Sequence, residues 1–530
     1  TRYKLVTGVQ TCALPILELP GVLEEAVVPL DSLSADLQWQ TTGSQIAVTL
    51  NDLRFSNADG EGQAQATWRT GDPARSRSKS RFPGVLDLQA SLSRLDGTRV
   101  HRYLPQTILK SARDYVREAV TQGTATGVKI RIKGDLWEVP ARDPRQGEFR
   151  VSANMRDVNF AYVPKAITSR GQALWPALAG VSGELTFDRT SMELRGATGR
   201  IAGWPALQLA RTDARIAYLT HSTTVVVTGQ IRGPLAEALQ VVNTSPLSTL
   251  TGHVLEKTVA NGPAEVRLGL SIPIYGLDRT RVQGTVSLAG NDLQITPDSP
   301  ALLRARGNVL FSETGMTLSG AQARMYGGDV RLEGGTRILP PGSLEPFFSL
   351  RAQGTFTAEA LRQARELGYV ARLAQTMQGS AGYSATLAFR RGMPEISLTS
   401  NLQGLAIQLP PPLNKPADAI LPLRFENVLL RESYAPGTRL QDQFLVEVGR
   451  LASVSYVRDI SGPQARVLRG SIGAGLGSID AAPVVEQGVV ANINLGRVDL
   501  DAWEQALARR HVRRSRLRRP DGGFGRARQR

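Results

Sequence analysis

The stretch GELTFDRTSMELRGATGRIAG, residues 183–203, returns 124 positions later as GNVLFSETGMTLSGAQARMYG, residues 307–327. Nine of the 21 aligned positions are identical. In both copies apolar and polar side chains alternate on either side of a short polar turn, as at Leu185 and Phe187 of the first copy. This alternation predicts a β-hairpin whose strands each present one apolar face. The chain therefore repeats a sheet-building unit, and such units usually form arrays that act through a continuous surface.

Most of the remaining chain shows the same strand-like alternation. Helical periodicity predicts amphipathic helices at 106–122, 233–242, 357–377 and 501–510. The helix at 357–377 is the clearest, with Thr357 as its N-cap.

These patterns divide the chain into segments that differ in their expected structure. They are an artefact-like N-terminal segment (1–16), a β-strand segment (17–100), a helix plus strands (101–164), a β unit with the first repeat copy (165–260), a β unit with the second copy (261–350), a helix (351–378), further strands (379–508), and a basic tail (509–530) that we expect to be disordered or out of frame.

The N-terminal segment resembles translated sequencing-adapter junctions, so it is set aside for fold reasoning. It contains the only cysteine, Cys12, and a chain otherwise free of cysteine suits an oxidising compartment such as a periplasm. No run of 18 or more apolar residues occurs, so we expect any membrane anchor to precede residue 17.

The net charge of +16 is concentrated at one end of the chain. Residues 509–530 hold ten Arg and one Asp and therefore supply +9. A second basic stretch, GDPARSRSKSRFPG at 71–84, alternates cations with small residues. It is interpreted either as a solvated loop or as a contact for lipid headgroups.

Motifs that would indicate catalysis or metal binding are missing from the sequence. The four histidines, at positions 101, 221, 253 and 511, have no metal-ligand spacing and no second cysteine to join them. No phosphate-binding loop, dinucleotide fingerprint or hydrolase nucleophile elbow occurs. We therefore expect no catalytic residues, no metal and no cofactor.

The apolar strand faces are mainly aliphatic, and this composition argues against nucleic-acid binding. Aromatic residues are only 6% of the chain, whereas binding of bases by a sheet needs aromatic side chains for stacking. A long antiparallel sheet must either cover its apolar face or leave an unusually large apolar patch. The face is therefore either an ordinary core, packed against another layer, or the interior of a trough that hydrocarbon ligands fill.

Four segments together resemble the YhdP branch of the AsmA-like proteins. The first is LQASLSRLDGTRVHRYLPQTILKSARDYVREAVTQGTATGVKIRIKGDLWEVP (88–140), which includes a YLP motif at Tyr103, Leu104 and Pro105. The others are the block VSGELTF…LRGATGRIAG (181–203), LQGLAIQLPPPLNKPA (402–417) and GVVANINLGRVDLDAW (488–503). In order, the resemblance covers 17–508.

The resemblance implies a mainly β fold: an elongated, twisted antiparallel sheet curled into a repeating β-groove, with a few amphipathic helices. It implies a periplasmic protein of a Gram-negative bacterium, anchored in the inner membrane, that conducts phospholipids between the inner and outer membranes. Phospholipids and the two membranes are the expected partners, and the oligomeric state is left open. The expected lining of the groove is Leu185, Phe187, Met192, Leu194, Val309, Phe311, Met316 and Leu318.

An alternative of a different class is a structural scaffold of the envelope whose apolar faces are all covered by the protein itself. Each of the eight expected lining residues would then be an ordinary sheet-core residue. A charged substitution at Phe187 or Phe311 separates the two hypotheses, because a core would lose folding and a groove would lose lipid. The third hypothesis is that the protein is an enzyme, and no sequence motif supports it.

Overall fold

Alternating side chains form long, paired strands in a computed structural model of the protein. The structure describes residues 2–6, 16–140, 143, 145–165, 173–219, 223–251, 253, 255–276, 279–297, 299–336, 348–390, 393–434, 437–462, 464–475, 485–495 and 498–504. The expected basic tail at 509–530 and most of the segment 1–16 lie outside these residues.

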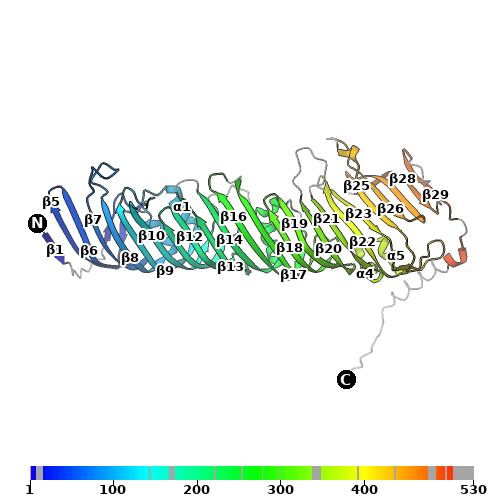
Figure 1. Ribbon diagram of the computed structural model, residues 1–530, viewed down its shortest axis with the longest axis horizontal. Helices are drawn as coiled ribbons and strands as arrows, with labels where there is room; N and C mark the ends of the chain where they lie inside the picture. The colour runs from blue at the N-terminus through cyan, green and yellow to red at the C-terminus, as the bar shows by residue number, and fades with distance from the viewer. Residues whose placement is uncertain are drawn as a thin grey trace, which may run out of the picture. The chain divides into compact units, whose positions relative to one another are not determined.

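The chain forms two units. Unit 1 consists of residues 1–291 with 310–313, and unit 2 consists of 292–309 with 314–530. Within each unit the strands lie side by side in a large antiparallel sheet that stays open (Figure 1). The predicted mainly β fold is therefore confirmed.

In unit 1 successive long strands pair antiparallel along one sheet. They are β5 (Asp36–Thr42), β6 (Gln45–Ser56), β7 (Gly60–Arg69), β8 (Val85–Asp96), β9 (Val120–Asp135), β10 (Gly147–Phe160), β11 (Leu178–Asp188), β12 (Ser191–Ile201), β13 (Trp204–Ile216), β14 (Thr224–Pro234), β16 (Pro263–Pro273) and β17 (Arg281–Gln294). Short strands extend this sheet: β1 (Arg2–Val6) on β5, β4 (Ser32–Ser34) on β6, and β15 (Val259–Asn261). The strands β2 (Ile16–Glu18) and β3 (Val27–Pro29) form a separate two-stranded sheet.

Unit 2 continues in the same manner, with one parallel pair at its end. Its strands are β18 (Leu302–Ser312, of which Leu310 onward groups with unit 1), β19 (Gly315–Met325), β20 (Gly327–Thr336), β21 (Phe348–Thr357), β22 (Met377–Arg390), β23 (Met393–Ser400), β24 (Leu405–Ile407), β25 (Leu423–Leu429), β26 (Gln441–Val448), β27 (Ala452–Asp459), β28 (Arg466–Ala474) and β29 (Gly488–Ile493). The parallel pair is β28 with β29.

Helices of unit 1 lie at one edge of the sheet. The 3-10 helix η1 (Gly97–Tyr103) and α1 (Lys110–Ala119) follow β8, and α2 (Leu235–Thr244) with α3 (Leu247–Leu250) follow β14. All neighbouring pairs from β8 to β14 are antiparallel, so β8 and β14 run in the same direction and end at the same edge. We call this the helix edge. The opposite, hairpin edge carries the connections β5–β6, β7–β8, β9–β10, β11–β12, β13–β14 and β16–β17.

The sequence repeat is part of a longer structural repeat. Its two copies form the hairpins β11–β12 and β18–β19, as the alternation predicts. In each case two further strands and then a helix follow the hairpin, namely β13, β14 and α2 in the first and β20, β21 and α4 (Ala358–Gln363) in the second. Both helices contain the tetrapeptide AEAL, at 236–239 and at 358–361.

A β-bulge explains one set of identical positions in the repeat. The pairing register shifts after Leu194 between β12 and β13, and after Leu318 between β19 and β20. Within the bulges Gly196 has φ 57° and Gly320 has φ 61°. This left-handed conformation is disfavoured for residues with a Cβ, so the bulge selects glycine at both positions.

A close strand contact explains a second set of identical positions. A Cβ placed on Gly183 would lie 3.0 Å from the Cα of Ala197, and a Cβ on Gly307 would lie 2.7 Å from the Cα of Ala321. Ala197 and Ala321 are themselves buried. Small residues at these places therefore allow the two strands of each hairpin to approach each other.

The predicted helix 357–377 is wrong as a single helix. Thr357 does cap α4, since its hydroxyl accepts a hydrogen bond from the backbone NH of Ala360 at 3.2 Å. The helix then breaks into η4 (Arg365–Leu367), α5 (Tyr369–Leu373) and η5 (Ala374–Thr376), and β22 begins at Met377. Gly368, at φ 52°, lies between η4 and α5 in a conformation that favours glycine.

The other predicted helices exist with different ends. The segment 106–122 forms α1 only from Lys110, and the strand β9 begins as early as Val120. The segment 233–242 forms α2 with Pro234 at its N-cap. Of 501–510, residues 501–504 are helical and the remainder lies outside the described residues. Three short helices of the described residues were not predicted: η1 after β8, α3 after α2, and η6 (Arg431–Tyr434) after β25.

Fully buried apolar side chains of unit 1 gather toward the helix edge. One cluster contains Val158, Val181 and Ala197. A second consists of Ile201, Leu207 and Leu209, against which Ala238 and Val241 of α2 pack. The core of unit 1 therefore occupies the strand ends near the helices.

Candidate functional site

The strand register of unit 1 aligns apolar side chains into continuous rows on one face of the sheet. Phe187, for example, pairs with Val151 on one side and Met192 on the other, and Leu185 pairs with Ala153 and Leu194. The complete set, called here the apolar rows, consists of three rows: Leu37, Leu50, Ala66, Leu88, Ile132 and Phe149; Ala64, Ala90, Ile130, Val151, Phe187, Met192, Ile216, Val225 and Ile272; and Ala153, Leu185, Leu194, Ala214, Val227, Leu270 and Val282.

Side chains of the apolar rows are only half-buried. Apart from Ala64, every member of the three rows keeps part of its surface open to solvent. At the helix edge, by contrast, Val181 is 4% exposed and Leu207 is 3% exposed. A sheet face that is sandwiched beneath a second layer is fully buried at its centre. The described residues of unit 1 therefore provide no complete second layer over the apolar rows.

The opposite face of the same strands is charged and forms ion pairs. Arg131 of β9 bridges two neighbouring strands, because its guanidinium contacts Asp87 and also lies 3.3 Å from Glu148. The hydrogen bond from Arg131 lowers the pKa of Asp87. On β12, Arg195 lies 2.8 Å from Glu193, and this hydrogen bond lowers the pKa of that carboxyl group. This face is therefore a solvated surface, and the sheet is amphipathic.

Polar contacts fasten the helices at the helix edge. The hydroxyl of Tyr115 on α1 donates to the carbonyl of Tyr162 at 3.1 Å, and burial raises the pKa of Tyr162 to about 12. Trp204 on β13 donates from Nε1 to Gln240 on α2 at 3.1 Å. The helices therefore form a border of the apolar rows along one edge of the sheet.

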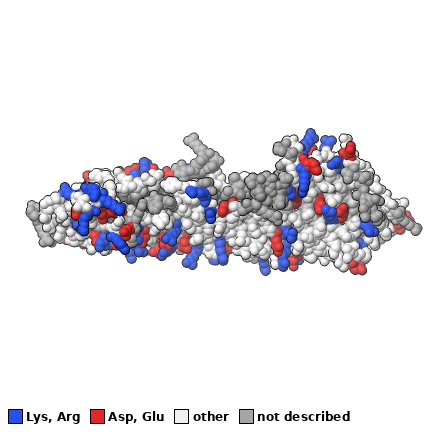
Figure 2. Space-filling model, turned by 45° about the horizontal axis from the view of Figure 1, so that its top comes forward, with Lys and Arg blue, Asp and Glu red and all other residues white. Residues whose placement is uncertain are grey.

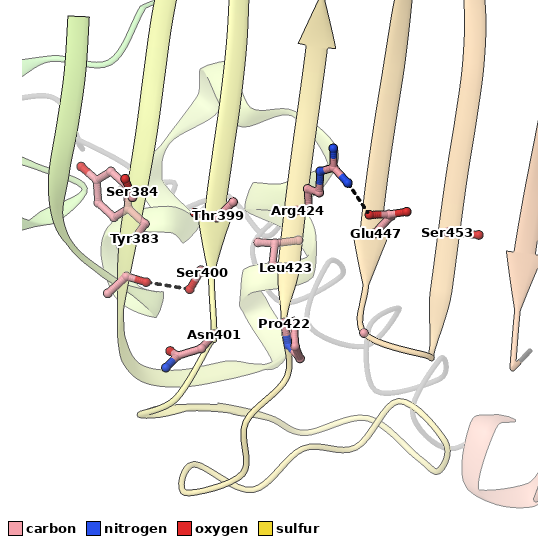
Figure 3. A pocket seen from close by; sticks show the side chains of 12 residues that line it. Tyr383, Ser384, Thr399, Ser400, Asn401, Pro422, Leu423, Arg424, Glu447 and Ser453 are labelled. Atoms are coloured by element: carbon pink, nitrogen blue, oxygen red, sulfur yellow. Dashed lines mark hydrogen bonds and ion pairs between the residues drawn. The ribbon is translucent and has the colours of Figure 1, made fainter. Parts of the chain in front are cut away.

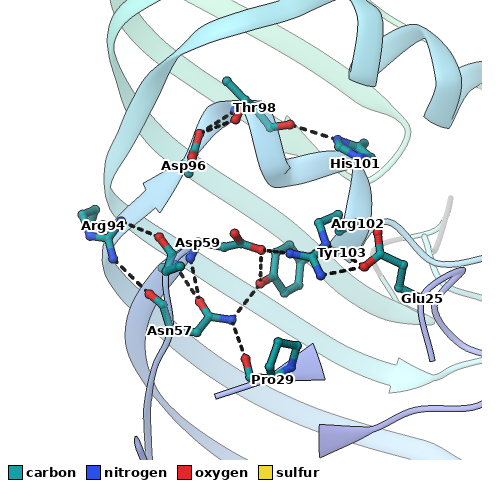
Figure 4. A network of polar contacts seen from close by, with 12 residues as sticks. Glu25, Pro29, Asn57, Asp59, Arg94, Asp96, Thr98, His101, Arg102 and Tyr103 are labelled. Atoms are coloured by element: carbon teal, nitrogen blue, oxygen red, sulfur yellow. Dashed lines mark hydrogen bonds and ion pairs between the residues drawn. The ribbon is translucent and has the colours of Figure 1, made fainter. Parts of the chain in front are cut away.

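A buried polar network holds η1 against the β6–β7 turn, as Figure 4 shows. Asp59 accepts from Arg102 at 2.6 Å and from the Tyr103 hydroxyl at 2.9 Å, and Arg102 also binds Glu25 at 2.6 Å. Asn57 donates to Tyr103 at 3.0 Å. The Arg102 hydrogen bond lowers the pKa of Glu25, and burial raises the pKa of Tyr103. We call Asn57, Asp59, Arg102 and Tyr103 the η1 clamp.

Unit 2 carries an equivalent apolar row. It consists of Ala321, Leu332, Ala352, Ala385, Leu398, Phe425, Val446, Val454 and Ile472. The first three are buried and the remainder are half-buried. Phe444, beside this row, packs edge-on against Phe425 at 5.5 Å and lies under the guanidinium of Arg458. Each unit therefore has its own apolar sheet face.

A hollow of about 780 Å³ lies on the polar side of unit 2, where β22, β23, β25 and β26 approach the loop before β25 (Figure 3). Arg424 lines it and lies 3.6 Å from Glu447. The Ser400 hydroxyl donates to the carbonyl of Gly382 at 2.7 Å. The described lining contains no histidine or cysteine, so its serines have no neighbouring base that would activate them. This hollow is a surface feature of a solvated face.

Comparison with known sequences decides the family. The sequence profile of the YhdP protein family matches residues 15–523. The chain belongs to the YhdP family. It is also similar to the "Intermembrane phospholipid transporter YhdP" of Escherichia coli strain K12, with 24% identity over 343 residues, which are 63% of this chain and 25% of that protein. The chain thus spans about a quarter of that curated relative. None of the solved structures matches it.

In this member of the YhdP family, four of the eight expected lining residues come together. Leu185, Phe187, Met192 and Leu194 lie in adjacent positions of the apolar rows, where Leu194 also borders the Val158 cluster. All four are half-buried.

The other four expected lining residues belong to β18 and β19. Val309, Met316 and Leu318 are half-buried residues of unit 2. Phe311 groups with unit 1, where its ring lies against Gly284 of β17.

Two parts of the site escaped prediction. The apolar rows extend over β5 to β10 and β13 to β17, far beyond the repeated hairpins. Alternation in those strands was the available signal, but which residues face each other depends on register. The η1 clamp was also missed, since its turn, NADGEG, has the composition of an ordinary loop.

Within the residues that the structure describes, no helix is both long enough and apolar enough to cross a bilayer. Across the same residues, no group of three or more His, Cys, Asp or Glu side chains is placed to hold a metal ion.

Proposed function

We propose that this chain is a periplasmic part of a YhdP-type protein that conducts phospholipids between the inner and outer membranes. Acyl chains would lie along the apolar rows, and headgroups would remain in water at the hairpin edge. The protein would be anchored to the inner membrane by a segment other than those described. The name of the E. coli relative, an intermembrane phospholipid transporter, supports this assignment.

The observation that carries the proposal is the half-buried state of the apolar rows. Hydrocarbon that contacts such a face leaves water, and each CH2 group contributes about 0.8 kcal/mol. The rows offer many similar aliphatic contacts. A lipid that shifts along the sheet by the width of one strand therefore exchanges its contacts for equivalent ones. The sheet therefore suits sliding, and no catalytic step is assigned to the protein.

Lipid extraction tests the proposal directly. The full chain is produced in a Gram-negative host, purified, and analysed by native mass spectrometry and by chromatography of extracted lipids. We expect phospholipid to copurify and to be lost on unfolding. Folded protein that is consistently free of phospholipid would contradict the proposal and would favour a structural scaffold.

A further inference from the structure

The loop between β7 and β8 is ordered by its own serines. The Ser76 and Ser78 hydroxyls lie 2.8 Å apart, and Ser78 Oγ donates to the carbonyl of Ser80 at 3.1 Å. In addition, Ser78 NH donates to Ser76 Oγ and Ser80 NH donates to Ser78 Oγ, each at 3.2 Å. The even-numbered positions of RSRSKSR (75–81) thus form a hydrogen-bond ladder.

The odd-numbered positions of this loop present cations to solvent. Arg75, Arg77, Lys79 and Arg81 are all exposed, and we call them the basic lip. Figure 2 shows Lys and Arg side chains gathered over the first strands of unit 1. The one acid of the loop, Asp72, accepts a hydrogen bond from the backbone NH of Ala74 at 2.9 Å. The alternation in the sequence therefore separates a structural side of the loop from a charged side.

The charge of the basic lip is largely uncompensated. Arg77 lies 3.5 Å from Glu138 but remains 72% exposed, and Arg81 donates to the carbonyl of Ser44. Among the residues that the structure describes, Arg75 and Lys79 have no acidic partner within ion-pair distance. Four cations within seven residues repel one another unless an anion lies between them.

Aromatic side chains connect the basic lip to the apolar rows. Phe82, 52% exposed, stacks on Trp68 with 6.1 Å between the ring centroids, and Trp68 Nε1 donates to the Pro83 carbonyl at 2.9 Å. Trp68 lies two residues beyond Ala66 on β7, so the rings continue the apolar rows toward the hairpin edge. Leu136 NH donates to the Gly84 carbonyl at 2.9 Å, so the backbone of the next residue, Trp137, lies close to the end of this loop. The Trp137 side chain is 60% exposed.

Cation, aromatic and aliphatic groups thus follow one another from the hairpin edge inward, in the order of the layers of a phospholipid. We propose that the basic lip is a binding site for the headgroup of an anionic phospholipid whose acyl chains lie on the apolar rows. Phe82 and Trp68 take the glycerol and carbonyl level, where aromatic side chains are favoured in membranes. The site selects anionic over zwitterionic lipid, because the ammonium of phosphatidylethanolamine is repelled. This inference rests on the proposed function.

Competition between two lipids tests the site. The delipidated full chain is mixed in detergent with equal amounts of phosphatidylglycerol and phosphatidylethanolamine of the same acyl chains, and the bound lipids are measured by native mass spectrometry. The test variant combines Arg75→Gln, Arg77→Gln, Lys79→Gln and Arg81→Gln. The matched control combines Arg195→Gln, Arg211→Gln, Arg215→Gln and Arg267→Gln. These four substitutions remove the same amount of charge at exposed positions elsewhere on unit 1.

We expect the wild-type and control proteins to be enriched in phosphatidylglycerol. In the test variant the ratio of bound phosphatidylglycerol to bound phosphatidylethanolamine should fall at least about fivefold. A fivefold change corresponds to the effect of one cation at an anionic lipid surface. The total amount of bound lipid should stay unchanged, and high salt should reproduce the loss. The single variant Lys79→Glu, at an exposed position without an ion pair, should lower the preference in the same direction.

The remaining outcomes are distinct. If the wild-type protein binds neither lipid, the proposed function itself fails. If it binds lipid and the test variant keeps the wild-type preference, or if test and control variants lose it equally, the headgroup site is overturned while the groove stands. If the test variant loses only cosedimentation with phosphatidylglycerol vesicles and keeps the preference in detergent, the basic lip docks on a bilayer surface and the proposed site is wrong.

Discussion

Phe187 and Met192 lie directly opposite each other across the β11–β12 hairpin, and both are half-buried. Val151 and Ile216 continue the row on either side. Because these apolar side chains keep part of their surface open to solvent, we expect the sheet to lose one of them without unfolding. A substitution in this row therefore tests the proposed groove against a closed core.

Phe187→Lys should remove lipid and leave the protein folded. A lysine at a half-buried place can direct its ammonium to water while its stem packs on the sheet. We expect a loss of about 1–2 kcal/mol of stability from the missing ring contacts, together with a clear loss of copurified phospholipid. Circular dichroism and native mass spectrometry measure the two effects.

Thr186→Lys is the matched control for that variant. Thr186 lies on the opposite face of the same strand, in register with Glu193. Lipid content should be unchanged here. If Phe187→Lys unfolds the protein while Thr186→Lys does not, the face is a core and the conduit is wrong.

Asp59→Ala should strongly destabilise unit 1 through the η1 clamp. The Asp59 side chain is 8% exposed and that of Arg102 is 20% exposed. Removal of the carboxylate leaves the Tyr103 hydroxyl without its acceptor and leaves Arg102 with the more exposed Glu25 as its acidic partner. Loss of a buried carboxylate that accepts two hydrogen bonds costs about 2–4 kcal/mol.

Urea unfolding of the full chain measures this loss, with Asp52→Ala as the control. Asp52 pairs with Arg54 at 3.2 Å, but the two side chains are 60% and 69% exposed. Its removal should cost less than about 0.5 kcal/mol. Equal effects of the two substitutions would show that the η1 clamp is no stronger than a surface ion pair.

Gly196→Ala and Gly320→Ala should each destabilise their bulge by about 1–2 kcal/mol, because an L-residue with a Cβ is strained at positive φ. The space around both positions is open, so the backbone conformation alone is tested. Gly269→Ala is the control, since no atom lies within 3.7 Å of its Cβ position and its φ is ordinary. Thermal unfolding should show a loss for the first two and none for the third.

The repeated hairpin was predictable because its constraints are local. Alternation of apolar and polar residues marks its strands. The bulge and the close contact between strands require glycine and alanine at fixed positions, so both copies have the same residues there. The apolar rows were predictable only within each hairpin. Across β5 to β17 they depend on loop lengths and bulges, which shift the register and are not visible in a strand's own pattern.

Helix ends and the η1 clamp mark the limit of sequence reasoning for this chain. Periodicity across 357–377 is genuine, yet Gly368 divides the segment, and Met377 already belongs to β22, where it pairs with Ile407 of β24. Strand pairing at this end overrides local helix propensity. Asn57 and Asp59 resemble turn residues in the sequence. Their partners Arg102 and Tyr103 are more than 40 positions away, so only the fold brings them together.

Tyr383→Phe should stabilise unit 2. The Tyr383 side chain is 7% exposed and its ring lies 6.0 Å from Phe356, but its hydroxyl is buried without a hydrogen-bond partner among the described residues. Removal of an unsatisfied buried hydroxyl should add about 1 kcal/mol. Urea unfolding at neutral pH measures the gain, and Tyr275→Phe, at a side chain 72% exposed, should give none.

Tyr383→Phe should also change how the stability of unit 2 depends on pH. Burial raises the pKa of Tyr383 to about 12, above the value near 10 of an unfolded tyrosine. Between these values the folded protein keeps a proton that the unfolded chain has lost, so rising pH favours unfolding by about 1.4 kcal/mol per pH unit for this residue. The stability advantage of Tyr383→Phe should therefore grow between pH 10 and 12. An advantage that stays constant across this range would mean that the phenol is not buried in the folded protein.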